Sequence, residues 1–255
     1  MQPLPASPIF DPLRAILARL PPDSWPSHAK LTTAAEGIVT QRGQPIRFVS
    51  PRDHTDRERR YYELRIAESG EVETRPGNWH DLFNALAWIA FPKAKAAINA
   101  QHAAILEERG EAEAKRRSPE RDALTLFDEG GVIVASSSPE LLRLIVDFEW
   151  KALFWERRTE VARAMRFIAF GHALYEQARE PYLGMVAKTV FVPLREGFDA
   201  DTLLAAHFAR RENFATPKMM APMPVLGVPG WHASQDASFY DDASHFRSKG
   251  VRPGA

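Results

Sequence analysis

The chain lacks several features that would each point to a class of protein. Its 255 residues contain no cysteine, which excludes disulfides, cysteine catalysis, iron–sulfur clusters and cysteine-ligated zinc. A metal site would therefore have to use His, Asp, Glu or Asn side chains. The sequence also has no dinucleotide-binding or P-loop glycine motif, no H-E-x-x-H motif and no G-x-S-x-G motif, so the familiar fingerprints of these enzymes are missing.

An excess of charge of either sign is also missing. The 33 basic and 33 acidic residues cancel, so no overall field attracts nucleic acid or an anionic membrane. Apolar runs are interrupted by charge before they reach the length of a membrane span, and the N-terminus has no basic lead followed by an apolar run. We therefore expect a cytoplasmic protein that binds no membrane, is unlikely to bind nucleic acid, and takes an unknown small molecule or anion as its partner.

The composition that is present is typical of a globular protein, with 45% hydrophobic and 26% charged residues. We expect a single α+β domain, mostly helical, with β-hairpins and a long irregular C-terminal tail packed on the core. Residues 1–30 form a Pro-rich segment with a short amphipathic helix over residues 10–20, with Asp11 as N-cap and Pro12 at its first position. Residues 31–212 form the α+β core, and residues 213–255 form an extended Pro-, Gly- and aromatic-rich tail that folds back on it.

Two stretches of the core have the composition of hairpins. "YYELRIAESGEVETR" predicts one with its turn at Ser69-Gly70, and a short strand "PIRFV" precedes it. "ALTLF" and "VIVAS" predict a second, joined by residues 128–131. Ser138 then caps a helix with Pro139 at its first position. The charged stretches "PRDHTDRERR" and "EERGEAEAKRRSPERD" predict an exposed loop and a solvated helix end with a loop.

Other stretches predict helices. Residues 79–108 predict two of them, because Pro92 interrupts the first and suits the start of the second. Residues 155–177 predict one long helix with a single apolar stripe, formed by Val161, Met165, Ile168, His172 and Tyr175. "MVAKTVFVPL" predicts a largely buried strand, and "DADTLLAAHFARR" predicts another helix.

The stretch "NWHD" admits a structural and a functional interpretation. Asn78 is a good N-cap and Asp81 falls at the third helical position, so the pair resembles a capping box. The cap does not account for His80, which the helix dipole keeps neutral and so suited to act as general base or metal ligand. Asn84 lies one turn on, so His80, Asp81 and Asn84 predict one polar cluster at a helix N-terminus, a place suited to an anion.

The second helix of this region carries a polar stripe of Lys95, Asn99 and His102. Most such stripes face solvent; the alternative is that the Pro92 junction brings this one close to His80.

His172 lies on an apolar stripe, where a histidine is either a satisfied core residue or a ligand. Gly171 beside it would allow another backbone to come close, and Glu176 one turn on could orient the imidazole. In the tail, Asp241 and Asp242 are either solvated or suited to a hard cation or general base. His232 and His245 add weak candidate ligands.

Several long stretches together resemble one family: "NWHDLFNALAW", "FPKAKAAIN", "RDALTLFDE", "FGHALYE", "PYLGM", "PVLGVPGW" and "FYDD". They are similar to an uncharacterised bacterial family, domain of unknown function 3025, over about residues 46–246. The resemblance brings no established activity, but it implies that these segments belong to one domain, tail included. The residues in the matching stretches are His80, Asp81, Asn84, Asn99, Asp122, Asp128, His172, Tyr240 and Asp241.

Two functional hypotheses follow. The first is a metal-dependent hydrolase with His80, Asp81, Asn84, His102 and His172 as catalytic candidates and His80, His102, Asp241 and Asp242 as candidate ligands of a divalent metal. A helix pair after a hairpin loosely resembles the ββα-metal nucleases, although no histidine ends the first strand here. The second is a non-catalytic binding or interaction protein whose polar residues cap helices and anchor the tail. Convergence of His80, Asn84, His102, His172 and Asp241 on one pocket would favour a site.

Overall fold

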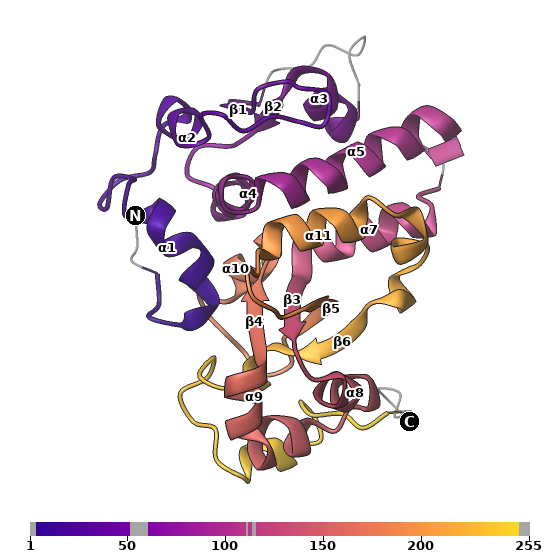
Figure 1. Ribbon diagram of the computed structural model, residues 1–255. Coiled ribbons are helices and arrows are strands. Elements are labelled where there is room, and N and C mark those ends of the chain that lie inside the picture. The colour runs from indigo at the N-terminus through magenta and orange to yellow at the C-terminus, as the bar shows by residue number, and fades with distance from the viewer. Residues whose placement is uncertain (1–3, 52–60, 111, 114–115, 250–255) are drawn as a thin grey trace.

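The computed structural model describes residues 4–51, 61–110, 112–113 and 116–249. The expected loop at residues 51–60 lies outside these ranges except for Pro51. Within them the chain forms a mixed four-stranded sheet with helices on both faces (Figure 1). A separate two-stranded sheet is formed by residues in the first third of the sequence. The expected α+β class is confirmed.

The larger sheet has the strand order β4-β3-β5-β6. β3 (Gly131–Ser136) lies antiparallel to β4 (Met165–Ala169) and parallel to β5 (Val186–Pro193), which is antiparallel to β6 (Ala221–Pro224). Every residue of β3 is buried, as expected for a central strand covered on both faces. β6 has proline at its second and last positions and lies at the edge, the place where a strand tolerates a missing N–H donor.

The two faces of β3 contribute to two different clusters of buried side chains. Val132 and Val134 belong to a cluster that includes α1, α4, α10 and the tail. Ile133 and Ala135 belong to a second cluster with α5, α7 and α11. Because successive side chains of a strand point to opposite faces, one short strand is enough to organise both cores.

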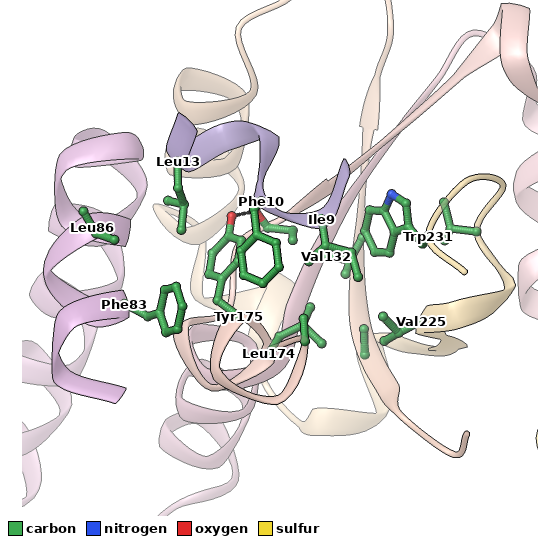
Figure 2. Packing of buried hydrophobic residues seen from close by; sticks show 14 of the residues in the cluster. Ile9, Phe10, Leu13, Phe83, Leu86, Val132, Leu174, Tyr175, Val225 and Trp231 are labelled. Atoms are coloured by element: carbon green, nitrogen blue, oxygen red, sulfur yellow. Dashed lines mark hydrogen bonds between the residues drawn. The ribbon is translucent and has the colours of Figure 1, made fainter. Parts of the chain in front are cut away.

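The N-terminal segment packs on the first of these clusters. A 3-10 turn (Pro8–Phe10) leads into α1 (Asp11–Leu17), and Phe10 lies 6.1 Å from Phe83 and 6.0 Å from Tyr175, measured between ring centroids (Figure 2). The expected helix is present but ends early, and Asp11 is not its cap. Ser7 caps the preceding turn, and Asp11 already lies within the helix.

The first expected hairpin is wrong. Residues of "YYELRIAES" form helix α3 (Tyr62–Ser69), and only the next stretch is a strand, β2 (Glu71–Glu73), which pairs parallel to β1 (Arg47–Val49). Parallel neighbours need a crossover connection, and α3 supplies it. Gly70 ends α3 with a φ of 72°, and a Cβ there would lie 2.0 Å from the carbonyl oxygen of Pro45. Helix α2 (His28–Ala34) precedes β1.

The second expected hairpin is wrong in its first half. "ALTLF" belongs to helix α7 (Pro119–Gly130), which runs directly into β3. Ala123, Leu124 and Phe127 are all fully buried, a spacing that suits one helical face. The helix after β3 is as expected: α8 (Pro139–Asp147) has Ser138 as its N-cap.

The expected long helix over residues 155–177 is also wrong. The chain forms a π-helical turn (Ala152–Glu156), α9 (Arg158–Ala164), strand β4 and then α10 (His172–Gln177). β4 completes the ladder on the open side of β3, and pairing of that exposed edge outweighs the helical periodicity of the sequence. His172 is therefore the first residue of a helix rather than a point on a stripe.

The remaining helices and the tail agree better with the sequence. α4 (Trp79–Ala90) and α5 (Pro92–Arg109) are separated at Pro92 as expected, and α11 (Ala200–Phe208) lies beside α5 (Figure 1). After α11 the chain forms short 3-10 turns around β6, at Arg211–Phe214, Pro217–Met219, Val225–Gly227 and Phe239–Asp241. Trp231, Tyr240 and Phe246 are buried, so the tail packs on the core. The division at residues 30 and 212 stays a prediction.

Candidate functional site

A polar cavity of about 510 Å³ lies between α3, α4, α5, α7 and α10. We call it the His80–His172 cavity. His80, Asp81, Asn84, His102 and His172, the five catalytic candidates, all line it. Its other lining residues are Pro51, Tyr62, Glu63, Ile66, Glu73, Arg75, Trp88, Lys95, Ile98, Asn99, Arg117, Thr125, Asp128 and Glu129.

The polar stripe of α5 does not face solvent. Lys95, Asn99 and His102 are 4%, 6% and 5% exposed, so the solvent-facing interpretation is wrong. α5 is covered by α3 on one side and by α11 and α7 on others, and its polar side chains are held by partners on α3, α4 and α7. Asn99, for example, donates from Nδ2 to the carbonyl oxygen of Glu63 at 2.9 Å. A buried stripe of this kind is costly unless each group is paired.

Lys95 stands at the centre of a hydrogen-bonded chain. Its Nζ donates to both carboxylate oxygens of Asp128, at 2.6 and 2.8 Å, and to Oδ1 of Asn84 at 2.9 Å. Asn84 in turn donates from Nδ2 to the hydroxyl of Tyr62 at 3.0 Å. The ammonium thus has one acceptor for each of its three protons, and it lies 5.5 Å from the centre of the Trp88 ring.

The pKa of Asp128 reports the balance of these forces. Burial by itself raises the pKa of this carboxyl, but the charge of Lys95, the neighbouring His172 and the hydrogen bonds from Lys95 outweigh it, so the pKa is lowered. For Tyr62 burial dominates and raises the pKa of the phenol despite the bond from Asn84. The carboxylate is therefore ionised and the phenol neutral at neutral pH.

His102 belongs to a second buried network, around Arg121. The guanidinium donates from Nε to Nδ1 of His102 at 3.4 Å and lies 3.2 Å from a Glu63 carboxylate oxygen and 3.5 Å from one of Glu113. Since arginine only donates, Nδ1 of His102 must be unprotonated and the ring neutral, with its proton on Nε2. Burial lowers the pKa of His102 to about 4.

This second network corrects another expectation. The stretch "EERGEAEAKRRSPERD" was expected to form a solvated helix end and a loop, and its residues 111, 114 and 115 lie outside the described ranges. Glu113 and Arg121, however, are 5% and 4% exposed. They carry opposite charges into the interior and compensate one another there.

The two histidines at the other end of the cavity contact each other. Nε2 of His80 lies 3.1 Å from Nε2 of His172, and Nδ1 of His80 lies 3.0 Å from a carboxylate oxygen of Glu176. Because that carboxylate can only accept, Nδ1 of His80 carries a proton. In the tautomer in which Nε2 of His172 donates to Nε2 of His80, Nδ1 of His172 has a free lone pair. Glu176 therefore orients His80, not His172 as expected.

Nδ1 of His172 is buried without a hydrogen-bond partner and lies 3.7 Å from a carboxylate oxygen of Asp128. The ring is only 7% exposed. Burial lowers the pKa of His172 to about 4. The charges of Lys95 and His80 act in the same direction, and the charge of Asp128 opposes them. The structure thus holds a neutral imidazole whose Nδ1 faces Asp128, a member of the Lys95–Asp128 ion pair.

Gly171 fixes the position of His172 relative to Asp128. A Cβ at Gly171 would lie 2.3 Å from the carbonyl oxygen of Glu129, so only glycine lets the start of α10 come this close to the end of α7. The expectation that Gly171 permits a close backbone approach is confirmed.

The cap interpretation of "NWHD" holds alongside the cavity. Asn78 accepts from the N–H of Asp81 through Oδ1 at 3.0 Å. Asp81, however, does not reach back to Asn78. It accepts from the backbone N–H of Arg75 at 2.8 Å and from its guanidinium at 2.8 and 2.9 Å. Burial opposes ionisation of Asp81, but these bonds prevail and lower its pKa. The cap makes no use of His80 or Asn84.

The charges that line the cavity disfavour an anionic ligand. Five carboxylates, from Glu63, Glu73, Asp81, Asp128 and Glu129, and three fixed cations, from Arg75, Lys95 and Arg117, are among the described lining residues. The net charge is therefore negative before any histidine is protonated. The α4 N-terminus alone does not outweigh this excess.

The remaining candidates lie elsewhere. Asp241 pairs with Lys151 at 2.6 Å on the surface, and Asp242 accepts from the N–H and hydroxyl of Ser244. Neither lines the cavity, so Asp241 does not converge with the histidines as the site hypothesis expected. His232 bonds within its own turn to Ser234. In the part of the chain that the structure describes, no group of three or more His, Asp and Glu side chains is arranged to hold a metal ion.

The sequence interpretation missed Asp128, Tyr62, Glu63 and Arg121 as residues around the cavity. A signal was present for α7, the helix of Asp128 and Arg121. Its start "SPE" (Ser118, Pro119) repeats the "SPE" of α8 (Ser138, Pro139), which was correctly interpreted as a cap and first turn.

Comparisons with known proteins add a family but no activity. In the described residues, no helix is long and apolar enough to cross a membrane. Neither a curated protein nor a solved structure was found to match the chain. A family model described as "Protein of unknown function (DUF3025)" matches residues 46–250, which include all the helices that surround the cavity. The chain belongs to this family of proteins of unknown function.

Proposed function

We propose that the chain is a hydrolase that binds a small neutral or cationic polar molecule in the His80–His172 cavity and acts on it by general acid–base catalysis. The observation that supports this most directly is the free Nδ1 of His172, buried beside the Lys95–Asp128 pair and connected through His80 to Glu176. A base held by a second group that is itself oriented by a third is the arrangement found in acid–base catalysis.

The histidine pair would accept a proton without placing charge on His172. In the proposed scheme a water reaches Nδ1 of His172, which requires a local opening of this buried site, and gives a proton to it, while the proton on its Nε2 moves to Nε2 of His80. The positive charge then rests on His80, next to the carboxylate of Glu176 at 3.0 Å. The low pKa of His172, about 4, favours this transfer because burial penalises charge on that ring.

The remaining steps of the proposed hydrolysis use Lys95. The water oxygen forms a bond to an electrophilic carbon of the ligand, and the electron pair moves onto the ligand oxygen. Lys95 is only 4% exposed, so its charge is little screened by water and is placed to stabilise that oxygen electrostatically. The leaving group then departs with the proton returned by the histidine pair.

A divalent metal, expected as a possible cofactor, is not needed by this scheme. Lys95 lines the cavity and already engages both oxygens of Asp128, a carboxylate that would otherwise be suited to bind a hard cation. The metal and the cytoplasmic location both stay predictions.

A binding protein without catalysis is the second candidate. It is favoured by the full pairing of Lys95, Asn84 and Arg121, whose polar groups are held by the protein itself. In that case the networks serve to shape a recognition surface and to hold α3, α4, α5 and α7 together.

The test uses 4-nitrophenyl acetate, a neutral ester, and 4-nitrophenyl phosphate, an anionic one. We expect hydrolysis of the acetate above the uncatalysed rate, reduced about 100-fold or more by His172→Gln. His232→Gln, which changes a histidine outside the cavity, is the matched control and should keep the rate. Equal rates in both variants, or preference for the phosphate, would refute the proposal. Binding of the ester with no hydrolysis would support the second candidate.

A further inference from the structure

A second cavity, of about 570 Å³, shares no lining residue with the first. It is formed by the turn after α8, by the facing ends of β5 and β6, and by the last described residues of the tail. We call it the tail cavity. Its lining residues are Phe148, Trp150, Gly184, Val186, Pro222, Met223, Pro224, Ser244, His245, Arg247 and Ser248.

The walls of the tail cavity are mainly apolar and aromatic. Phe148 and Trp150 stack with ring centroids 5.3 Å apart. The indole N–H of Trp150 donates to the carbonyl oxygen of Arg247 at 2.9 Å. Val186 is 56% exposed and is the most exposed of the large hydrophobic residues in the described part of the chain. Cavities of this size lined by apolar side chains with a few polar groups are typical small-molecule sites.

His245 supplies one of those polar groups. The N–H of Gly184 donates to Nδ1 of His245 at 2.9 Å, so Nδ1 is unprotonated and the neutral ring carries its proton on Nε2. That Nε2 is buried and has no hydrogen-bond partner, and the whole residue is only 5% exposed. A buried N–H without an acceptor is costly, and a ligand that supplies one would remove the cost.

Arg247 supplies the other polar group. It lines the same cavity two residues on, and its guanidinium makes no ion pair or hydrogen bond within the described part of the chain. Among residues 4–51, 61–110, 112–113 and 116–249, no acidic side chain lines the tail cavity. The next cation, Lys249, is already paired with Asp147 at 2.8 Å. The cavity therefore offers one neutral donor and one fixed positive charge; the carboxylate that acts on His245 is that of Asp242, which does not line the cavity and is bonded to Ser244.

We propose that the tail cavity binds an apolar monocarboxylate. The hydrocarbon part lies against the Phe148–Trp150 stack and Met223, and the carboxylate accepts from Nε2 of His245 and from the guanidinium of Arg247. A carboxylate has two oxygens and so can engage both donors, with charge-assisted bonds that are stronger than neutral ones. This inference is independent of the proposed hydrolysis, since the two cavities have no residue in common.

The test is calorimetric titration of the full chain with decanoate, and with 1-decanol as a probe of equal length without charge. We expect one decanoate per chain and binding of decanol weaker by about tenfold or more, since hydrogen bonds to a charged group are the strong ones. Arg247→Gln should bring decanoate close to decanol. Lys249→Gln is the matched control, because it removes a neighbouring charge outside the cavity, and should change affinity by less than about twofold.

Two more variants locate the ligand. His245→Asn keeps an acceptor near the Gly184 N–H but removes the Nε2 donor, and should weaken decanoate by about tenfold. Val186→Trp fills the cavity from its exposed side and should abolish binding of both probes. If His245→Asn fails to fold, the nitrogen resonance of His245 Nε2 in the wild-type chain replaces it and should shift on addition of decanoate. No binding of decanoate, equal affinity for decanol, or decanoate binding that Val186→Trp leaves intact would overturn the proposal.

Discussion

The Lys95–Asp128 pair offers the sharpest test of how the site is held together, because the chain contains a matched pair on its surface. Both Lys95–Asp128 and Lys151–Asp241 have a shortest N–O distance of 2.6 Å. The side chains of the first pair are 4% and 21% exposed, and those of the second are 37% and 59% exposed. The shortest distance is thus equal, while Lys95 is buried and donates to both oxygens of Asp128 and Lys151 is exposed and donates to one oxygen of Asp241.

We expect Asp128→Asn to lower the free energy of unfolding by about 3 kcal/mol, the lower end of the range for breaking a buried ion pair. The lower end applies because 21% of the Asp128 side chain still reaches solvent. The variant removes the negative charge that Lys95 contacts and leaves a buried ammonium with only neutral amide oxygens, from Asn84 and the new side chain, as acceptors among these contacts. Asp241→Asn should cost less than about 1 kcal/mol, as is usual for an exposed pair.

The assay is urea unfolding at pH 7, followed by circular dichroism, for both single variants and for the double variant Lys95→Met, Asp128→Leu. The double variant should recover most of the loss, since it removes both charges together. A cost for Asp128→Asn no greater than for Asp241→Asn would refute the reasoning. So would a double variant less stable than Asp128→Asn, because the penalty would then not come from an unpaired charge.

Two further predictions concern the same cavity. The pKa of His102 and of His172 is about 4, against 6.5 for an exposed ring, so the unfolded chain binds more protons between these values. The free energy of unfolding should then fall by about 3 kcal/mol for each ring as pH drops from 7 to 4, and urea titrations that show no fall, or the same fall in His102→Gln, would contradict this. Gly171→Ala should lower the free energy of unfolding by about 1–3 kcal/mol because its Cβ meets the Glu129 carbonyl oxygen at 2.3 Å. Gly130→Ala, whose Cβ meets nothing within 4 Å, should change thermal stability little, and equal melting temperatures for the two variants would rule out the clash.

The parts of the fold that could be predicted are those with strong local chemistry. Pro92 separates α4 from α5, Asn78 and Ser138 cap their helices, and the β5 strand stands out by its apolar residues. Each of these depends on the residue itself: a missing N–H, a side-chain oxygen near free backbone donors, or a run of β-branched side chains. The tail was placed on the core because its aromatic residues are too many to remain in water.

The errors arose where the same residues suit two structures. "YYELRIAES" alternates like a strand but forms α3, because β1 and β2 pair in parallel and need a helix between them. "MRFIA" continues a helical stripe but forms β4, because the edge of β3 was open. In both cases a contact between distant segments decided the matter, and no local pattern contains that information.

The sequence by itself determined which side chains needed an explanation: His80, Asn84, His102 and His172 were singled out by residue type and helical spacing. Tertiary structure decided that these four line one cavity while Asp241 does not, and it brought in Lys95 as a buried charge with Asp128 as its partner. The reason is physical. Spacing along a helix fixes which side chains share a face, but whether that face meets water or other helices depends on packing between segments far apart in the chain. That packing also sets burial, and burial sets the pKa values on which the proposed chemistry depends.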